Sequence, residues 1–187
     1  MRQLIGAFVL IGAAACTEQP SPQAVPDLES ISQALTEGMA EGFILKTGEG
    51  EPLLNGIVVK ASPKTGTRGS ILVEQAFPRG GTTNLHIHDQ GDELFYVVSG
   101  RGTATLGDKT EVIEPGDVIF VPKSGVHRIE NLDNDEPLKV VFFMDSPELV
   151  EQFWAIHTRV TSEPDRPITP EEKAAIEERI GGARRVN

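Results

Sequence analysis

Three of the four histidines in the chain and one glutamate have the residue types and spacing of a metal site. His86 and His88 are two residues apart, and Glu93 follows them after a turn that contains Gly91. Residues two apart in a β-strand point to the same face, so both imidazoles can point into one cavity. His127 comes later in the chain, from a strand that a closed barrel could bring opposite the first pair. Because imidazole is the commonest neutral metal ligand, these four residues are the candidate ligands of one divalent ion.

The donor set also restricts the identity of the metal. Three histidines and one carboxylate suit an octahedral transition-metal ion with open positions for water, oxygen or a bidentate substrate. Fe(II), Mn(II) and Ni(II) are favoured, while Zn(II) and Cu(II) also remain open. The lack of thiolate ligands argues against a closed structural zinc site. The carboxylate of Glu93 can complete one side of the coordination sphere.

For other residues near this stretch, the sequence gives weaker evidence of a functional role. Lys123 and Arg128 flank His127 and either steer an anionic substrate or are solvated. Of Phe95 and Tyr96, one is expected to face the core and the other to face outwards. His157, the fourth histidine, is expected to lie on a helix that packs against the barrel.

The elements that must position these side chains are short strands. Between residues 43 and 145, brief apolar runs alternate with turn signals rich in Gly, Pro and Asp. This pattern predicts an all-β sandwich or barrel. The expected strands span residues 56–60, 70–77, 83–88, 93–99, 102–106, 111–113, 118–121, 127–131 and 138–144.

Residues 146–187 are expected to form C-terminal helices. Ser146-Pro147-Glu148 has the order of a helix start, and Thr169 with Glu172 has the spacing of a capping box. Gly181-Gly182 is expected to end the second helix. Phe153 and Trp154 belong to an apolar stripe that either packs on the barrel or forms a lid over the substrate.

The spacing of these residues resembles two sequence motifs of the cupin superfamily. The first motif, G-x5-H-x-H-x3,4-E-x6-G, is matched throughout, and the second, G-x5-P-x-G-x2-H-x3-N, is matched except at its internal glycine. That glycine lies one place late, at Gly125, so a slightly different turn with the same ligand is expected. The other matching residues are Gly80, His86, His88, Glu93, Gly100, Gly116, Pro122, His127 and Asn131.

The resemblance covers roughly residues 52–144 and implies a single cupin barrel, that is, a double-stranded β-helix or jelly roll. The chain looks similar to small single-domain bacterial cupins related to quercetin dioxygenases. That similarity implies a dioxygenase-like oxidoreductase, with a metal-assisted isomerase as a second reaction type. It also implies that Glu93 is a ligand or, if it swings away from the ion, a catalytic general base. The alternative is a lipid-anchored module that binds a sugar or organic anion through its metal without catalysis. Small cupins also often dimerise, which implies a homodimer.

Charge and composition exclude one class of partner. The formal net charge is −11 and the pI is about 4.8. Nucleic acid is therefore not an expected partner, because neutralising phosphates requires a basic face. Small-molecule substrates or ligands remain.

The N-terminus is expected to direct export. Met1-Arg2 is followed by an apolar stretch from Leu4 to Ala15, which is short for a membrane span and ends in small residues. Residues 1–16 therefore resemble a signal peptide with a lipobox-like end, in which Cys16 is lipidated; removal by an ordinary signal peptidase is the alternative. Residues 17–42 are expected to be a tether and a short helix. With lipid on Cys16, the protein is expected on the periplasmic side of a bacterial membrane. Without lipid, it is expected in the periplasm or outside the cell.

Overall fold

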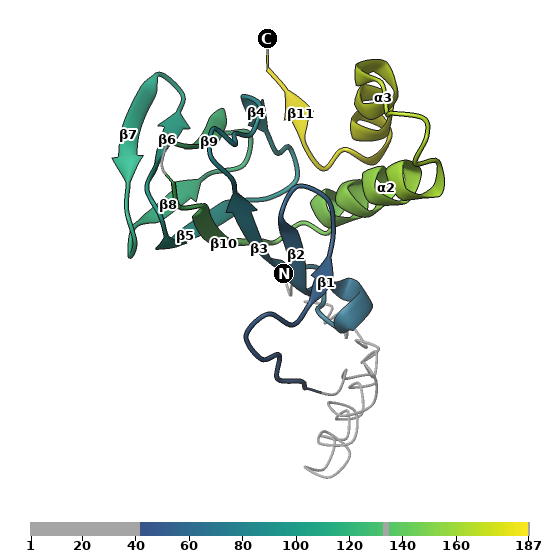
Figure 1. Ribbon diagram of the computed structural model, residues 1–187, viewed down its shortest axis with the longest axis horizontal. Helices are drawn as coiled ribbons and strands as arrows, with labels where there is room; N and C mark the ends of the chain where they lie inside the picture. The colour runs from purple at the N-terminus through teal and green to yellow at the C-terminus, as the bar shows by residue number, and fades with distance from the viewer. Residues whose placement is uncertain (1–41, 133–134, 187) are drawn as a thin grey trace, which may run out of the picture. The chain divides into compact units, whose positions relative to one another are not determined.

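The structure, a computed structural model, describes residues 42–132 and 135–186. Its elements are a series of short strands followed by two C-terminal helices and a last short strand (Figure 1). They are β1 (Glu51–Pro52), β2 (Ile57–Ala61), the 3-10 turn η1 (Pro63–Thr65), β3 (Ile71–Phe77), β4 (His86–Ile87), β5 (Glu93–Ser99), β6 (Gly102–Leu106), β7 (Lys109–Ile113), β8 (Val118–Val121), β9 (His127–Asn131), β10 (Leu138–Met144), α2 (Glu148–Ser162), α3 (Pro170–Ile180) and β11 (Arg184–Arg185).

The strands form two antiparallel sheets that face each other. One has the order β1-β2-β3-β10-β5-β8, and the other has the order β11-β4-β9-β6-β7. Neighbours in the sheets are often far apart in sequence, as in the pairing of β3 with β10 and of β4 with β9. This arrangement is consistent with the jelly-roll barrel of cupins and confirms the predicted all-β fold class.

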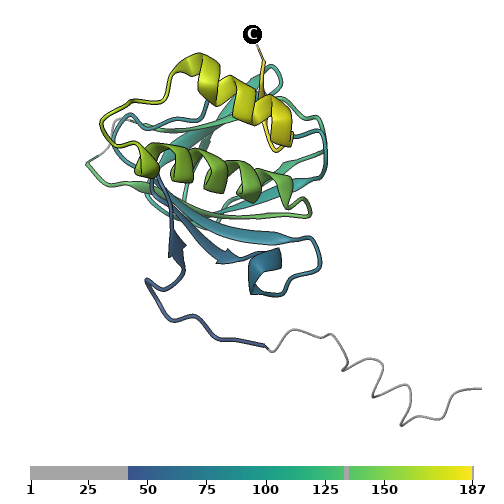
Figure 2. The same cartoon turned by 90° about the vertical axis from the view of Figure 1, so that its right-hand side faces the viewer.

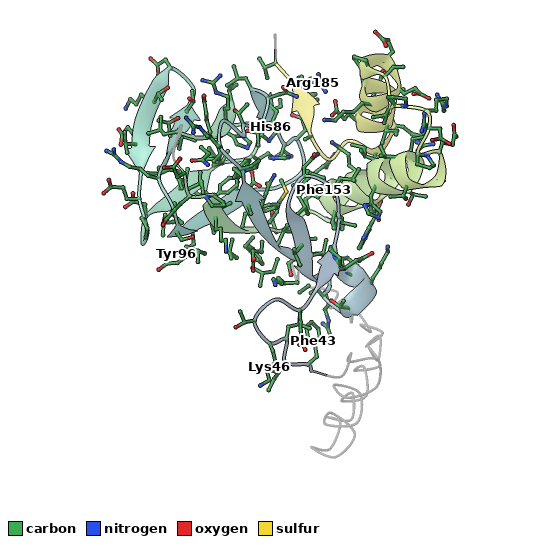
Figure 3. All side chains as sticks on the ribbon, viewed as in Figure 1. Phe43, Lys46, His86, Tyr96, Phe153 and Arg185 are labelled. Carbon is green, nitrogen blue, oxygen red and sulfur yellow. The ribbon has the colours of Figure 1, made fainter. Side chains whose placement is uncertain are left out.

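Alternation along the strands decides which side chains enter the barrel. In β5, Glu93, Phe95 and Val97 are buried, whereas the side chains between them are exposed. Tyr96 is one of these exposed residues and points away from the barrel interior (Figure 3). The expectation that Phe95 and Tyr96 face opposite ways is therefore confirmed. The same alternation carries Glu93 into the interior as a polar member of an otherwise apolar face.

The two helices lie next to each other alongside the barrel (Figure 2). Leu149 and Val150 of α2 are buried in the barrel core, and Phe153 packs against it. Trp154 also packs there, with the ammonium of Lys64 3.2 Å from its ring centroid. A cation in this position is attracted to the face of the indole ring. The apolar stripe of α2 thus mainly attaches the helix to the barrel.

The helix ends agree with the sequence at α3 and differ at α2. Thr169 and Glu172 form the predicted capping box, and Gly181 ends α3 in a left-handed conformation. By contrast, α2 begins at Glu148 after Pro147, and Ser146 makes no cap to the backbone. The hydroxyl of Ser146 instead donates to the carboxylate of Glu148, so the helix start is one residue later than expected.

Three strand assignments also differ from the sequence expectation. β1 was not expected, and the strand predicted over residues 83–88 is reduced to His86–Ile87. The two expected C-terminal helices are present, and after them Arg184–Arg185 forms an additional strand, β11, which pairs with β4. The tail thus returns to the barrel and extends the sheet that carries two of the candidate ligands.

The predicted N-terminal features lie outside the described residues. They are the signal peptide, Cys16, the tether and the short helix before residue 42, and they stay predictions, as does the homodimer. Within residues 42–132 and 135–186, neither helix combines the length and the apolar character that crossing a membrane requires.

Candidate metal site

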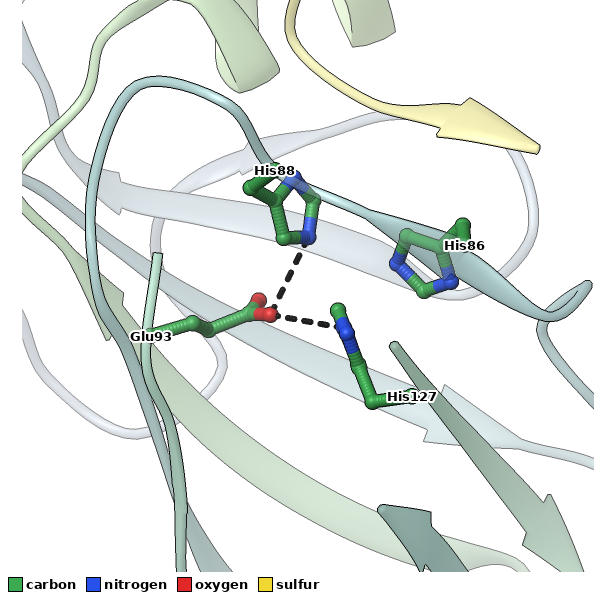
Figure 4. A group of neighbouring side chains, drawn as sticks. All are labelled: His86, His88, Glu93 and His127. Atoms are coloured by element: carbon green, nitrogen blue, oxygen red, sulfur yellow. Dashed lines mark ion pairs between the residues drawn. The ribbon is translucent and has the colours of Figure 1, made fainter. Parts of the chain in front are cut away.

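The fold brings the four predicted ligands together from three strands. His86 lies on β4 and His88 just after it, Glu93 begins β5, and His127 begins β9. One donor atom from each residue can be chosen so that all of them lie within 4.8 Å of one another (Figure 4). His88, Glu93 and His127 are buried, and His86 is partly exposed. The site therefore has an interior side and a more accessible side at His86.

Glu93 lies between two of the histidines. Its Oε2 atom is 3.1 Å from Nε2 of His88 and 3.1 Å from Nε2 of His127. The ring of His86 is close to the ring of His127, with 4.0 Å between the centroids. The four side chains thus form one compact group at one position inside the barrel.

Backbone carbonyls set the orientation of all three imidazoles. In each ring Nδ1 lies within hydrogen-bond distance of a carbonyl oxygen, so Nδ1 carries the proton and donates it. This is the usual outer-shell arrangement of metal-binding histidines, because it leaves Nε2 with a free lone pair. The contacts are His86 to Asn84 at 2.7 Å, His88 to Gly182 at 2.7 Å, and His127 to Gly125 at 3.0 Å.

The atoms that face one another in this group need a cation between them. Nε2 of His88, Oε2 of Glu93 and Nε2 of His127 are buried and have no hydrogen-bond partner. Two neutral imidazole lone pairs and a carboxylate oxygen are all acceptors, so their 3.1 Å contacts are favourable only if a positive charge is shared among them. A proton or a metal ion can supply it. The donor set therefore fits a divalent transition-metal ion.

The electrostatics of the group keep the carboxylate ionised. Burial acts to raise the pKa of Glu93, but its contacts with His127 and His88 outweigh burial and lower that pKa to about 2. Burial, together with the nearby His127 and His88, lowers the pKa of His86 to about 3. For His88, burial acts to lower the pKa, and its contacts with Glu93 outweigh burial and raise it. At neutral pH, Glu93 is an anion and His86 a neutral imidazole, as metal coordination requires.

A cavity of about 690 Å³ opens against this group. His86, His88 and Glu93 line it, together with Phe153 of α2. The rest of its wall is partly apolar, with Leu53, Ile57, Phe77, Phe95 and Phe142, and partly basic, with Lys173, Arg184 and Arg185. Its size is that of a site for a small organic molecule.

Several sequence expectations about neighbouring residues can now be compared with this geometry. Lys123, Arg128, Tyr96 and His157 are absent from the cavity wall among the described residues, whereas Phe153 is part of it. Arg128 pairs with Glu130 at 3.5 Å. The basic residues that line the cavity are instead Lys173 of α3 and Arg184 and Arg185 after it. The sequence did not predict their position because no motif marks them.

Ser124 is held in a left-handed conformation in the turn before His127. Ser124 occupies the place of the motif glycine and adopts φ 61°, in the left-handed region that favours glycine. Two hydrogen bonds hold it there, from its backbone N–H to the carbonyl of His88 at 2.7 Å and from its hydroxyl to Asp89 at 3.1 Å. Ser124 thus adopts a backbone conformation that favours glycine, and the expectation of a slightly different turn stays a prediction.

Asn131, the last residue of the second motif, has a structural position. It is buried, and its amide nitrogen donates to the carbonyls of Phe77 and Pro78, each at 3.0 Å. These bonds hold the end of β9 against the loop that follows β3.

Comparison with known proteins agrees with the fold. Residues 73–144 match the family described as "Cupin domain". An uncharacterized protein of Methanocaldococcus jannaschii is 39% identical over 37% of this chain and 55% of its own length. A crystal structure of an uncharacterized Klebsiella pneumoniae protein with a double-stranded β-helix domain is 22% identical, with a TM-score of 0.47, over 57% of this chain and 91% of that one.

Two further relatives have functional names. The quercetin 2,3-dioxygenase of Bacillus subtilis is 31% identical over 46% of this chain and 26% of its own length. The oxalate-binding protein of Thermotoga maritima is 27% identical over 49% of this chain and 74% of its own length. The chain thus spans 55% of the Methanocaldococcus protein and 26% of the dioxygenase.

Proposed function

We propose that the protein is a metal-dependent cupin that binds a small organic anion and acts on it as an oxygenase-type enzyme. The observation that carries this proposal is the convergence of His86, His88, Glu93 and His127 into one group, three of whose members, His86, His88 and Glu93, line a cavity. A site buried on all sides would serve only structure, whereas this one borders a space that a substrate can fill.

The four side chains would hold Fe, Mn or Ni, with Zn or Cu as further candidates. When bound, such an ion supplies Lewis acidity towards substrate oxygen atoms and, if it is redox-active, the electron-transfer chemistry that reactions with dioxygen require. The role of the chain is to hold the donors with Nε2 directed inwards and to exclude water on the side of His127, which is fully buried. Glu93 fits a ligand role best, since a carboxyl group with a pKa of about 2 is a weak base at neutral pH.

The residues of the cavity wall favour a substrate that combines an anionic group with an apolar frame. Lys173 and Arg185 flank Glu177, at 3.8 Å and 3.5 Å from its carboxylate oxygens. Together with Arg184, these cations outnumber the two carboxylates of the wall, Glu93 and Glu177, by three to two, in a chain whose net charge is −11. Phe153 and Phe95 provide apolar surface in the same wall. A carboxylate or enolate on an aromatic or aliphatic frame matches this combination.

A second candidate is a binding module without catalysis. The Thermotoga relative named as an oxalate-binding protein is matched over 74% of its length, and oxalate is a small anion. A cupin that captures an anion through its metal would need the same ligands and the same basic wall. The two candidates therefore differ in turnover rather than in site composition.

Metal analysis is the first test. The purified chain is reconstituted with Fe, Mn, Ni and Zn in separate samples, and bound metal is quantified after removal of the excess. We expect close to one equivalent of at least one ion. Uptake far below one equivalent with every ion would contradict the proposed site.

Oxygen consumption separates the two candidates. The loaded protein is tested against flavonols, catechols and β-diketones, and in parallel the metal-dependent binding of oxalate is measured by calorimetry. Substrate-dependent oxygen uptake supports the enzyme. Tight binding that needs metal, with no oxygen uptake on any of these substrates, supports the binding module.

A further inference from the structure

The C-terminal tail, which here means residues 181–186 after α3, contacts the candidate metal site although it lies outside the segment that matches the cupin domain. Gly182 accepts a hydrogen bond from Nδ1 of His88 at 2.7 Å, although the two residues are 94 positions apart in the sequence. The matching segment ends at residue 144. His86 and His127, by contrast, donate to carbonyls only two positions away. Only the ring of His88 depends on a distant part of the chain for its orientation.

The strand that carries His86 also depends on the tail. β4 has two residues, and its register with β9 contains the single pair His86–His127. On its other edge, Arg184 and Arg185 of β11 pair with Ile87 and His86. The backbone N–H of Val186 adds a bond of 3.0 Å to the carbonyl of Leu85. A strand this short with one neighbour would be weakly held, so β11 supplies much of its support (Figure 1).

The tail itself is held in place by α2. The backbone N–H of Ala183 donates to Oε1 of Gln152 at 2.8 Å, and Gln152 is buried. Gly182 lies directly against the start of α2, where an added Cβ atom would come within 2.7 Å of the Glu148 carbonyl oxygen and of the Leu149 Cα atom. These neighbours are backbone atoms of a helix and cannot move aside easily. The carbonyl of Gly182 therefore has a fixed position that requires glycine.

We propose that the tail is a built-in part of the metal site, in which Gly182 is the positioning residue for His88 and Gln152 holds Gly182 in place. The carbonyl fixes the tautomer and the ring angle of His88, so that Nε2 faces Glu93 and the metal. The proposal rests on the proposed function in that it assumes a metal at these ligands. It adds that metal affinity depends on Gln152 of α2 and on Gly182, which both lie after the segment that matches the cupin domain.

Two substitutions test separate links of this chain of contacts. Gly182→Ala displaces the carbonyl by steric overlap, and Gln152→Leu removes the acceptor of the Ala183 N–H while keeping similar bulk. Gly102→Ala is the matched control, because a Cβ there comes within 2.4 Å of the Glu130 carbonyl, near the end of β9 opposite to His127 and on a strand with which the tail does not pair. Any general loss of stability from overpacking is common to the control and to Gly182→Ala.

The first measurement is metal affinity of the full chain by competition with a chromophoric chelator. We expect a decrease of roughly 10–100-fold for Gly182→Ala and Gln152→Leu, as is typical when an outer-shell partner of a metal-binding histidine is lost. Gly102→Ala should keep the wild-type affinity. Wild-type affinity in a folded Gln152→Leu variant would overturn the proposal, even if Gly182→Ala failed to fold.

The second measurement does not need metal. In metal-free, ¹⁵N-histidine-labelled protein, the Nδ1 proton of His88 should exchange slowly with solvent in the wild type and in Gly102→Ala, and fast in Gln152→Leu. Equal exchange in all of them would overturn the role of the tail. If the wild type bound no metal but showed this exchange pattern, the proposed function would fail while the positioning of His88 by the tail would stand.

Discussion

Arg185 lies directly opposite His86 in the antiparallel pair formed by β11 and β4. Directly opposed residues in such a pair project their side chains to the same face of the sheet, so Arg185 is directed to the side on which His86 faces the cavity (Figure 3). The Arg185 side chain is 40% exposed, and its guanidinium is 3.5 Å from the buried carboxylate of Glu177, which Lys173 also contacts.

Substitution of Arg185 by Gln should weaken the binding of anions and spare that of neutral molecules. The loss of a charge-assisted hydrogen bond predicts an affinity for benzoate about tenfold lower, with benzamide affected little. Calorimetry on the metal-loaded protein measures both. Arg179→Gln, an exposed change on α3, is the control and should bind both ligands like the wild type. An equal decrease for benzoate and benzamide would indicate a structural effect of Arg185.

Substitution of Glu93 by Gln should remove most of the metal affinity. The amide keeps the shape of the side chain but loses the negative charge that lies 3.1 Å from two imidazole nitrogens. Because losing an outer-shell partner alone costs about 10–100-fold, losing a charged ligand is expected to cost more than about 100-fold. Chelator competition measures it, with the exposed Glu111→Gln as control. A variant that keeps its metal but loses turnover would instead assign Glu93 the role of general base.

Cys16 is predicted to anchor the protein to a membrane. It is the only cysteine in the chain, so labelled palmitate incorporated into the protein would report on this residue alone. We expect Cys16→Ser to move the protein from the membrane fraction to the soluble fraction, since acyl chains contribute about 0.8 kcal/mol per buried methylene. Fractionation and mass spectrometry of the intact protein measure this. A wild-type protein that is already soluble and unlabelled would support ordinary signal-peptide cleavage.

The cluster of candidate metal ligands could be predicted from the sequence because a local pattern marks each of its members. His86 and His88 are two positions apart at the end of a strand, Glu93 begins a strand whose alternation is regular, and His127 follows a recognisable turn. The predicted strand over residues 83–88 was too long because its first residues bond differently. The Asn84 carbonyl accepts from the His86 ring instead of joining a ladder, and Thr83 contacts Ile129 partly through its hydroxyl.

The tail could not be predicted, because its contacts are long-range and leave no pattern. β11 is two arginines long, which shows neither alternation nor β-propensity. Gly182 reads in the sequence only as a helix terminator, and its carbonyl, like any backbone group, carries no sequence signal. Gln152 lies on the helix beside an apolar stripe and gives no sign that it holds a segment 31 residues away. Contacts made by backbone atoms at the surface of a barrel become visible only in the structure.

The contact between α2 and α3 predicts a defined pH dependence of stability. Glu172 contacts Arg159 and Arg166, and its hydrogen bonds with Arg166 and Thr169 lower its pKa to about 2. A carboxyl group with a lowered folded-state pKa stabilises the fold fully above its unfolded pKa, near 4.3, and this contribution is lost as the pH falls towards about 2.

Glu172→Gln should therefore lower the melting temperature of the metal-free protein at pH 7. Below about pH 4.5, this decrease relative to the wild type should become smaller as the pH falls. Glutamine can still complete the capping box with Thr169, so the effect reports on the arginine contacts. Glu171→Gln, an equally early acidic position of α3, controls for the helix dipole. Scanning calorimetry from pH 7 to pH 2 measures the difference. A difference that is independent of pH would show that the ionised carboxylate is not its source.

Ser124 should tolerate glycine and reject a β-branched residue. Its φ of 61° costs any residue with a Cβ atom, and its hydroxyl bond to Asp89 offsets part of that cost. Ser124→Gly relieves the strain and loses the bond, so little net change is expected. Ser124→Val loses the bond and keeps the strain, and it should be less stable than Ser124→Gly by about 1–2 kcal/mol. Urea unfolding of the metal-free variants measures this difference. Equal stability of the two would mean that the turn before His127 can relax out of the left-handed conformation without cost.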